Sequence, residues 1–404
     1  MRVLLSTIGS RGDVQPLVAL ASALRTRGQN VRLCVPPDFQ AWIESLGFAV
    51  TPIGPWLRSA GKASPSAPPL TPERRRELAD ASVAAQFETV AAAAHGCDAI
   101  VAATALQIAA CSVAETMRIP YVFAAYCPAV LPSPHHAPPV LGALGDAPAP
   151  APDDYAALWT RDRDRFNDLF GASLNAHRAS LGLAPVDDVR GHVFTDRPWL
   201  AADRTLAPWP DPASGAVRQT GAWMLRDERP LSGELQAFLD AGDPPIYFGF
   251  GSTRATHDLG RVMIESARAC GRRAIVSRGW ADLAPLDGEP DCLSIGEANL
   301  QALFTRVAAI VHHGGAGTTT LAALAGAPQV VIPQMYDQHY WARRVQEIGI
   351  GVAHAPGAPT TASLARALED ALRPGVADRA RSFAADVRRD GADIAAAQVM
   401  AMCM

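Results

Sequence analysis

The chain has 404 residues, enough for two domains of ordinary size that each enclose a hydrophobic core. Hydrophobic residues make up 49% and charged residues 19%, as in globular proteins, and the formal net charge of −4 argues against nucleic acid or an anionic membrane as a partner. No run of 18 apolar residues occurs, so we expect no stable membrane insertion.

The cysteines predict a reducing compartment. There are seven of them, an odd number, and none forms a Cys-x-x-Cys pair. The N-terminus runs directly into a strand-like segment and lacks the features of a signal peptide. We therefore expect a cytoplasmic protein whose thiols are reduced.

The first half reads as strands alternating with helices. Residues 2–8 form an apolar strand-like run, and Pro16 suits the first turn of the helix that we expect next. Residues 31–35 alternate as a second strand. This β–loop–α–β opening indicates a doubly wound α/β domain, and its loop places Asp13 at the carboxyl end of the first strand, where such sheets bind ligands.

Further along, residues 99–104 and 121–124 read as buried parallel strands with a helix at 107–118 between them. Two stretches, 54–72 and 127–153, are rich in proline and other loop residues. Long irregular loops in a compact domain are often functional, so we interpret both as walls of an acceptor site. Disordered insertions explain them equally well.

Residues 155–181 predict a highly charged helix. Asp162 and Asp164 form a D-x-D pair, a pattern that also occurs at metal–nucleotide sites. The charges alternate in sign through this segment, which favours a solvated helix face over a metal site.

A Pro-rich stretch at 205–222 is the best candidate for a linker, and a second α/β domain follows it. An Ala-rich helix is expected at about 375–404. The strands of the second domain are predicted at residues 246–250, 274–277, 293–297, 308–311 and 329–333.

The most informative stretch is 308–320, in which an apolar strand ends at His312 and His313 and is followed by three glycines and three threonines. A helix start offers unpaired N–H groups and the positive end of the helix dipole, and glycines allow a phosphate to approach. We interpret the stretch as a cradle for a phosphate or diphosphate. A plain βα turn is the alternative.

Asp13 stands alone, without a second acidic residue beside it in the sequence to complete a metal site. It can cap the following helix or act as a general base toward a hydroxyl nucleophile, and the residues alone do not separate these roles. The chain has no Walker sequence, and no G-x-G-x-x-G follows the first strand.

Several motifs resemble the glycopeptide-antibiotic glycosyltransferases, which are vancomycin-type enzymes of glycosyltransferase family 1. They are found at 9–13, 195–203, 219–223, 249–252, 277–280 and 311–319. The resemblance implies the GT-B fold, in which two Rossmann-like, doubly wound parallel-sheet domains face each other across a cleft. It implies an acceptor-binding domain at 1–205, a linker at 206–222, a domain for the nucleotide sugar at 223–380, and a last helix at 381–404 that crosses back.

The resemblance also implies roles for individual residues. Asp13 matches the general base, Asp337 is a second candidate for that role, and His313 is expected to carry charge opposite the leaving diphosphate. The residues implied in donor binding are Ser10, Arg11, Gly12, Ser252, Gly296, Asn299, His312, His313, Gly314, Gly315, Ala316, Gly317, Thr318, Asp337 and Gln338.

The activity so implied is an inverting, metal-independent transfer of a hexose or deoxyhexose from a dTDP- or UDP-sugar to a hydroxyl of a natural-product aglycone. The acceptor is expected to be hydrophobic or a peptide, no cofactor is expected, and the protein is expected as a monomer or homodimer. Residues 12–16 also resemble a segment of the glycosyltransferases that act on sterols or lipids. The alternatives are therefore such an enzyme, a nucleotide-sugar epimerase, or a non-catalytic homologue.

Overall fold

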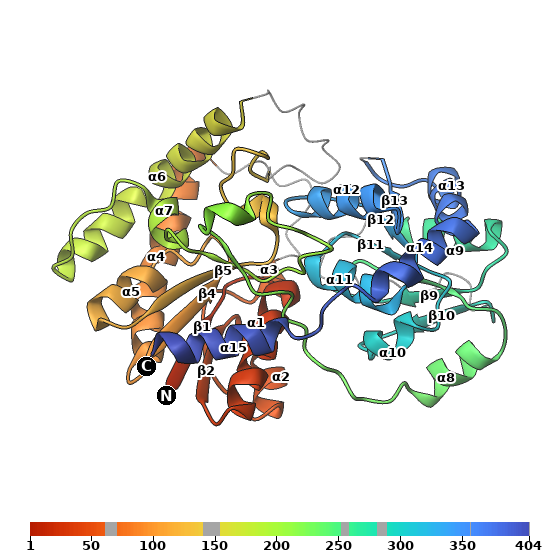
Figure 1. The fold of residues 1–404 in the computed structure, drawn as a ribbon, viewed down its shortest axis with the longest axis horizontal. Coiled ribbons are helices and arrows are strands. Elements are labelled where there is room, and N and C mark those ends of the chain that lie inside the picture. Colours follow the sequence, from red (N-terminus) through yellow and green to blue (C-terminus); the bar gives the residue numbers. More distant parts are fainter. Residues whose placement is uncertain (61–70, 140–153, 252–257, 281–288, 356, 404) are drawn as a thin grey trace.

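The computed structural model describes residues 1–60, 71–139, 154–251, 258–280, 289–355 and 357–403. The chain forms two α/β domains that lie side by side, each built on a parallel sheet (Figure 1). The two doubly wound parallel sheets expected from the sequence are therefore confirmed.

The first sheet has the strand order β3-β2-β1-β4-β5-β6-β7, and all of its pairings are parallel. Its strands are β1 (Arg2–Ser6), β2 (Asn30–Val35), β3 (Ala49–Pro52), β4 (Ala99–Ala103), β5 (Tyr121–Ala125), β6 (Trp199–Leu200) and β7 (Arg218–Gln219). The order reverses between β1 and β4, so the crevice of this sheet opens beside the end of β1.

The second sheet repeats this plan with the order β10-β9-β8-β11-β12-β13, again parallel throughout. Its strands are β8 (Ile246–Gly249), β9 (Ala274–Ser277), β10 (Cys292–Ile295), β11 (Ala309–His312), β12 (Gln329–Val331) and β13 (Gly351–Ala353). Its order reverses between β8 and β11, which places the crevice beside the glycine-rich turn after His312.

Helices cover both sheets. In the first domain they are α1 (Arg11–Thr26), α2 (Gln40–Ser45), α3 (Leu57–Ala60), α4 (Pro72–Ala94), α5 (Ala110–Met117), α6 (Tyr155–Ser180) and α7 (Val189–Phe194). After β7 they are α8 (Gly233–Asp240), α9 (Leu259–Ala269), α10 (Leu300–Phe304), α11 (Ala316–Ala325), α12 (Gln338–Ile348), α13 (Thr361–Ala371), α14 (Pro374–Ala384) and α15 (Gly391–Met402).

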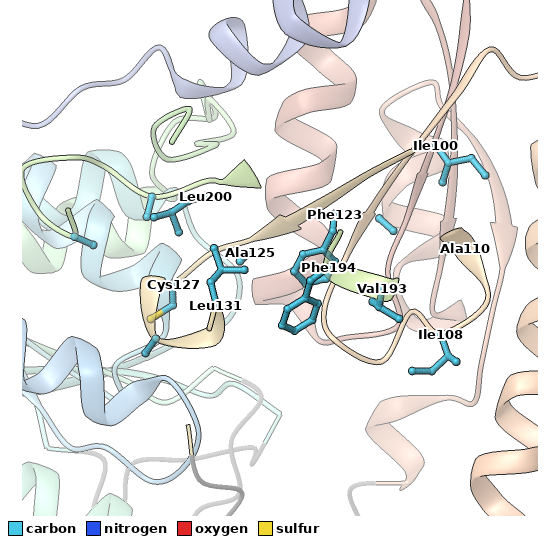
Figure 2. Close-up of a cluster of buried hydrophobic side chains, with 14 of the residues drawn as sticks. Ile100, Ile108, Ala110, Phe123, Ala125, Cys127, Leu131, Val193, Phe194 and Leu200 are labelled. Carbon is cyan, nitrogen blue, oxygen red and sulfur yellow. The ribbon is translucent and has the colours of Figure 1, made fainter. Parts of the chain in front are cut away.

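The core of the first domain lies on both faces of its sheet, because helices cover both. Leu4 of β1 packs into the cluster on one face, while Val3 and Leu5 pack into the cluster on the other. Figure 2 shows part of the former, where Phe123 of β5 stacks on Phe194 of α7 with ring centroids 4.4 Å apart. These cores fix the ends of the strands from which the site is built.

Two helices begin five residues earlier than the sequence pattern indicates. α1 begins at Arg11, with Ser10 as its N-cap, so Pro16 lies inside the helix and not in its first turn. α11 begins at Ala316, although the apolar helical pattern starts only at Leu321. Both differences arise because residue types that are common in loops, Gly12 and Asp13 in α1 and Gly317 with three threonines in α11, lie inside the helix here.

The segments between and after the two domains are also more structured than expected. Residues 218–219, within the expected linker 206–222, form β7 of the first sheet, and Leu206, Ala207 and Trp209 are buried. The helix expected over 375–404 is two helices, α14 and α15, and α15 packs against α1 in the first domain (Figure 1).

Candidate functional site

Asp13 lies in the first turn of α1, at the carboxyl end of β1. The backbone N–H and the hydroxyl of Ser10 donate hydrogen bonds to Asp13 Oδ2, at 2.7 and 3.3 Å. Gly9 makes room for this arrangement, since a Cβ there would stand 2.1 Å from Oδ2. The side chain therefore takes part in the capping of α1, which is one of the two roles considered for it.

The ionisation of Asp13 is also altered by its position. Burial raises the pKa of its carboxyl from 3.8 to about 6, against the opposing effect of the Ser10 hydrogen bonds. A carboxyl group with a pKa near the pH of the medium is suited to accept a proton during a reaction and release it afterwards. The geometry is thus compatible with both roles.

Asp337 is the second carboxyl group of the site, and it belongs to the other domain. It is the N-cap residue of α12, and the indole N–H of Trp341 donates a hydrogen bond to its Oδ2 at 3.1 Å. Burial, and to a smaller extent the negative charge of Asp13, raise the pKa of Asp337 to about 7, against the opposing effect of the Trp341 hydrogen bond. The influence of one charge on the other indicates that the two carboxyl groups lie near each other, across the boundary between the domains.

The turn between β11 and α11 has the shape expected of an anion cradle. Gly314 has a φ of +92°, and a Cβ at this position would stand 2.8 Å from the Val331 side chain, so the turn requires glycine. No side chain caps α11 at Gly315. The N–H groups of Ala316, Gly317 and Thr318 are therefore the unpaired donors of a helix start.

His313 lies over this helix start. A Cβ on Gly315 would stand 2.7 Å from His313 Nε2, which places that nitrogen close to the first turn of α11. The Nδ1 atom is buried and makes no well-formed hydrogen bond. Burial lowers the pKa of His313 to about 4, and the backbone of Gly249 beside the ring opposes this shift only in part.

Burial thus favours a neutral His313 ring near pH 7, whereas the imidazolium expected opposite the diphosphate stays a prediction. The physical reason is the loss of hydration on burial, which penalises the charged ring. A neutral imidazole still offers one N–H donor to a phosphate oxygen.

His312 serves the turn and does not face a ligand. It is fully buried; its Nε2 lies 2.9 Å from Gln329 Oε1, and its Nδ1 accepts a hydrogen bond from the Gly314 N–H at 3.0 Å. Burial lowers its pKa to about 3. Both ring nitrogens are thus occupied within the protein, and the structure does not bring His312 to the donor as expected.

Two further residues expected at the donor are engaged elsewhere. The side chain of Asn299 caps α10 and donates to the carbonyl oxygens of Asp227 and Arg229, at 3.0 and 2.7 Å. The Gln338 side-chain oxygen accepts hydrogen bonds from the backbone N–H groups of Gln334 and Met335, which holds the loop before Asp337.

The remaining residues expected to bind the donor differ in their surroundings. Gly296 is exposed, and a Cβ there would stand 3.1 Å from the Arg278 guanidinium. Gly12 is exposed in the first turn of α1, while the Arg11 guanidinium lies over the ring of Trp42. Ser252 lies outside the described residues.

Three residues that the sequence did not single out shape the site. The Tyr126 hydroxyl donates to the Asp13 carbonyl oxygen at 3.0 Å and so fixes the start of α1. Tyr336 has a φ of +55°, a conformation that is uncommon for a side chain of this size, directly before Asp337. Trp341 orients Asp337 through this hydrogen bond. In the sequence, only the spacing of four residues between the two, which is one helical turn, points to the contact.

The D-x-D pair on α6 is occupied by arginines. Asp162 pairs with Arg190 at 3.0 Å, and both side chains are largely buried, while Asp164 pairs with Arg163 at 2.8 Å. Within the described residues, no group of three His, Cys, Asp or Glu side chains is placed to hold a metal ion. Among the described helices, none is long and apolar enough to cross a membrane.

Comparison with known families matches both halves of the chain. Residues 3–133 match the glycosyltransferase family 28 N-terminal domain, and residues 285–398 match the C-terminal domain of erythromycin biosynthesis protein CIII-like proteins. The chain is also similar to the glycosyltransferase VinC, solved in complex with dTDP, with a TM-score of 0.65, 18% identity and coverage of 100% of this chain and 99% of that one. The GT-B fold is thereby confirmed.

Two curated relatives come from Amycolatopsis orientalis. The vancomycin aglycone glucosyltransferase is 50% identical over 98% of this chain and 96% of its own length. The dTDP-epi-vancosaminyltransferase is 44% identical over 94% of this chain and 92% of its own length. With identity at this level over nearly its whole length, the chain belongs to the family of vancomycin-type glycosyltransferases.

Proposed function

We propose that this glycosyltransferase is an inverting, metal-independent enzyme of glycosyltransferase family 1 that moves a hexose or deoxyhexose from a nucleoside diphosphate to a hydroxyl of a glycopeptide-type aglycone. The observation that carries the proposal is the placement of Asp13, in the first turn of α1, near Asp337, the N-cap residue of α12 in the other domain. It supports a single reaction centre assembled from both halves of the chain.

In the proposed reaction, Asp13 takes the proton of the acceptor hydroxyl while that oxygen attacks the anomeric carbon of the sugar. The bond from this carbon to the diphosphate oxygen breaks as the new glycosidic bond forms on the opposite face, so the configuration inverts. Asp13 leaves this step as the neutral acid, and the diphosphate leaves with one additional negative charge.

The uncapped start of α11 would stabilise that charge. Its first-turn N–H groups and the helix dipole favour an anion, and the neutral ring of His313 adds one hydrogen-bond donor. Asp337 and Gln338 match the family positions that hold the sugar hydroxyls. Because the Gln338 oxygen is already bonded to the backbone, only its amide N–H groups remain for the sugar.

For the donor we propose a dTDP-sugar in preference to a UDP-sugar. The name of one close relative specifies a dTDP-sugar, and a structure of the same fold was solved with dTDP. For the acceptor we propose a glycopeptide aglycone in preference to a polyketide, because a relative 50% identical to this chain is a vancomycin aglycone glucosyltransferase.

The test is incubation of the protein with dTDP-glucose, with and without vancomycin aglycone, followed by mass spectrometry. Transfer is expected only with the aglycone, and it should be unchanged by EDTA, since α11 takes the role of a metal in the proposal. Conversion of the donor without acceptor would support the epimerase alternative, which the named transferase relatives do not favour. Loss of transfer in EDTA would contradict metal independence.

A further inference from the structure

A cavity with a volume of about 510 Å³ opens between the domains beside the start of α1. Ligand pockets typically have volumes of roughly 300–1,000 Å³, so it is large enough for a substrate group. Four aromatic side chains from separate segments line it: Phe39, Trp42, Trp56 and Trp280. None of them takes part in the chemistry proposed above.

Three of these side chains belong to the first domain. Phe39 is buried in the short helix η1 (Pro37–Phe39), Trp42 is half-buried on α2, and Trp56, after β3, is 60% exposed. The Asp38 carboxylate accepts hydrogen bonds from the backbone N–H groups of Leu57 and Arg58, at 2.7 and 3.0 Å. This contact holds the segment that carries Trp56 against the segment that carries Phe39.

Trp280 closes the cavity from the second domain. Its ring lies nearly parallel to that of Phe39, with centroids 6.1 Å apart, and its backbone N–H donates to the Gly251 carbonyl oxygen at 2.9 Å. Gly279 has a φ of +55°, and a Cβ there would stand 2.5 Å from the same carbonyl oxygen. The turn that presents Trp280 is therefore fixed by close packing on the end of β8.

The charged residues of the cavity largely satisfy one another. The Arg11 guanidinium lies 3.7 Å from the ring centroid of Trp42 and 3.3 Å from Glu297 Oε1, so its charge is balanced across the domain boundary. The oxygens of Asp38 are taken by backbone N–H groups. The walls of the cavity therefore consist chiefly of aromatic ring faces, and Arg58 adds one polar group.

We propose that this cavity is a specificity subsite that binds an aromatic ring of the acceptor. The inference rests on the proposed function, since it requires an aglycone in the first domain. Three of the four aromatic side chains come from that domain, and Arg11 precedes the proposed base, Asp13, by two residues in the same helix turn. A ring held here would anchor the aglycone beside that helix. The nucleobase of the donor is the competing occupant.

Trp56→Ala tests the subsite with little risk to folding, because the side chain is mostly exposed. We expect calorimetric titration with vancomycin aglycone, which carries phenolic rings, to show binding about tenfold weaker, from lost stacking and apolar contact. Affinity for dTDP should change less than twofold. Trp56→Phe, which keeps an aromatic face, should recover most of the affinity for the aglycone. Leu181→Ala, at an exposed apolar residue after α6, should change neither the affinity for the aglycone nor that for dTDP.

The other outcomes overturn the proposal in distinct ways. Weaker dTDP binding with unchanged aglycone binding would assign the cavity to the nucleobase. Unchanged binding of both would leave the cavity without a role in recognition and so contradict the subsite, while transfer to the aglycone would still uphold the proposed function. If the wild-type protein binds neither the aglycone nor N-acetyltyrosine amide, by saturation-transfer NMR, no aromatic subsite exists.

Discussion

The negative charge of Asp13 raises the pKa of Asp337, although the first residue begins a helix of one domain and the second caps a helix of the other. Burial gives these carboxyl groups pKa values of about 6 and about 7, so Asp13 is the first of the two to lose its proton as the pH rises. Asp337 then remains neutral at the pH at which Asp13 becomes able to act as a base.

Replacing Asp13 by Asn should abolish most turnover while leaving the donor site intact. General base catalysis contributes about 10²–10⁴-fold, so we expect kcat to fall in that range. Affinity for dTDP should change less than twofold, because α11 and not α1 holds the diphosphate in the proposal. Asp164→Asn, at an exposed carboxylate on α6, serves as a control. A wild-type rate in Asp13→Asn would exclude the base assignment.

The same substitution should affect stability in a pH-dependent way. Because the pKa of Asp13 is higher in the folded protein than its ordinary 3.8, the folded state binds the proton more tightly, and ionisation costs stability as the pH rises through about 4 to 6. Asn resembles the neutral acid. Thermal unfolding should therefore show Asp13→Asn more stable than wild type at pH 8, with the difference lost at pH 3.5.

The pH profile separates Asp13 from Asp337 as the base. Since the base must be ionised, kcat/KM for the wild type should fall as the pH drops through about 6. Asp337 is still neutral at that pH, so Asp337→Asn should lower the rate by weakening sugar binding. The fall of kcat/KM near pH 6 should remain in this variant. If kcat/KM instead falls near pH 7 in the wild type, and this fall disappears in Asp337→Asn, Asp337 is the base.

The sequence predicted the two sheets because their strands are buried on both faces and read as short apolar runs. It also located the turn after β11, because glycine is required there by a φ of +92° at Gly314. It could not predict β6 and β7, which have two residues each and owe their pairing to their neighbours. Periodicity is not visible over so short a span.

The side chains of the site were harder to assign than its loops. His312 and His313 are adjacent and looked equivalent, but strand alternation sends one ring to Gln329 inside the protein and leaves the other over α11. Asn299 looked like a ligand group and instead binds the backbone of Asp227 and Arg229. Burial and tertiary partners decided these roles, and neither is encoded in local spacing.

The two histidines should therefore respond differently to alanine substitution. His313→Ala should weaken dTDP binding by about tenfold or more, as expected for the loss of one hydrogen bond to a charged group, with little change in stability. His312→Ala should lower the free energy of unfolding by about 2–4 kcal/mol, because Gln329 and the Gly314 N–H lose buried partners. Titration calorimetry and denaturant unfolding of both variants check this, and equal effects would contradict it.

A glycine pair tests the geometry of the cradle itself. Gly315→Ala places a methyl group 2.7 Å from His313 Nε2, so the ring must move away from the start of α11. The backbone φ of −66° at Gly315 suits alanine, which means that any effect comes from this contact and not from backbone strain. We expect dTDP binding to weaken by about tenfold, through the displaced hydrogen bond of the imidazole.

Gly375→Ala in the first turn of α14 is the matched control, since a Cβ there meets no atom within 4 Å. It should leave dTDP binding unchanged and stabilise the protein by about 0.5–1 kcal/mol, because alanine loses less backbone entropy on folding than glycine. Titration calorimetry with dTDP, together with thermal unfolding, measures both effects. If Gly315→Ala binds dTDP as the control does, His313 is not a donor contact, and the cradle must act through the backbone of α11 alone.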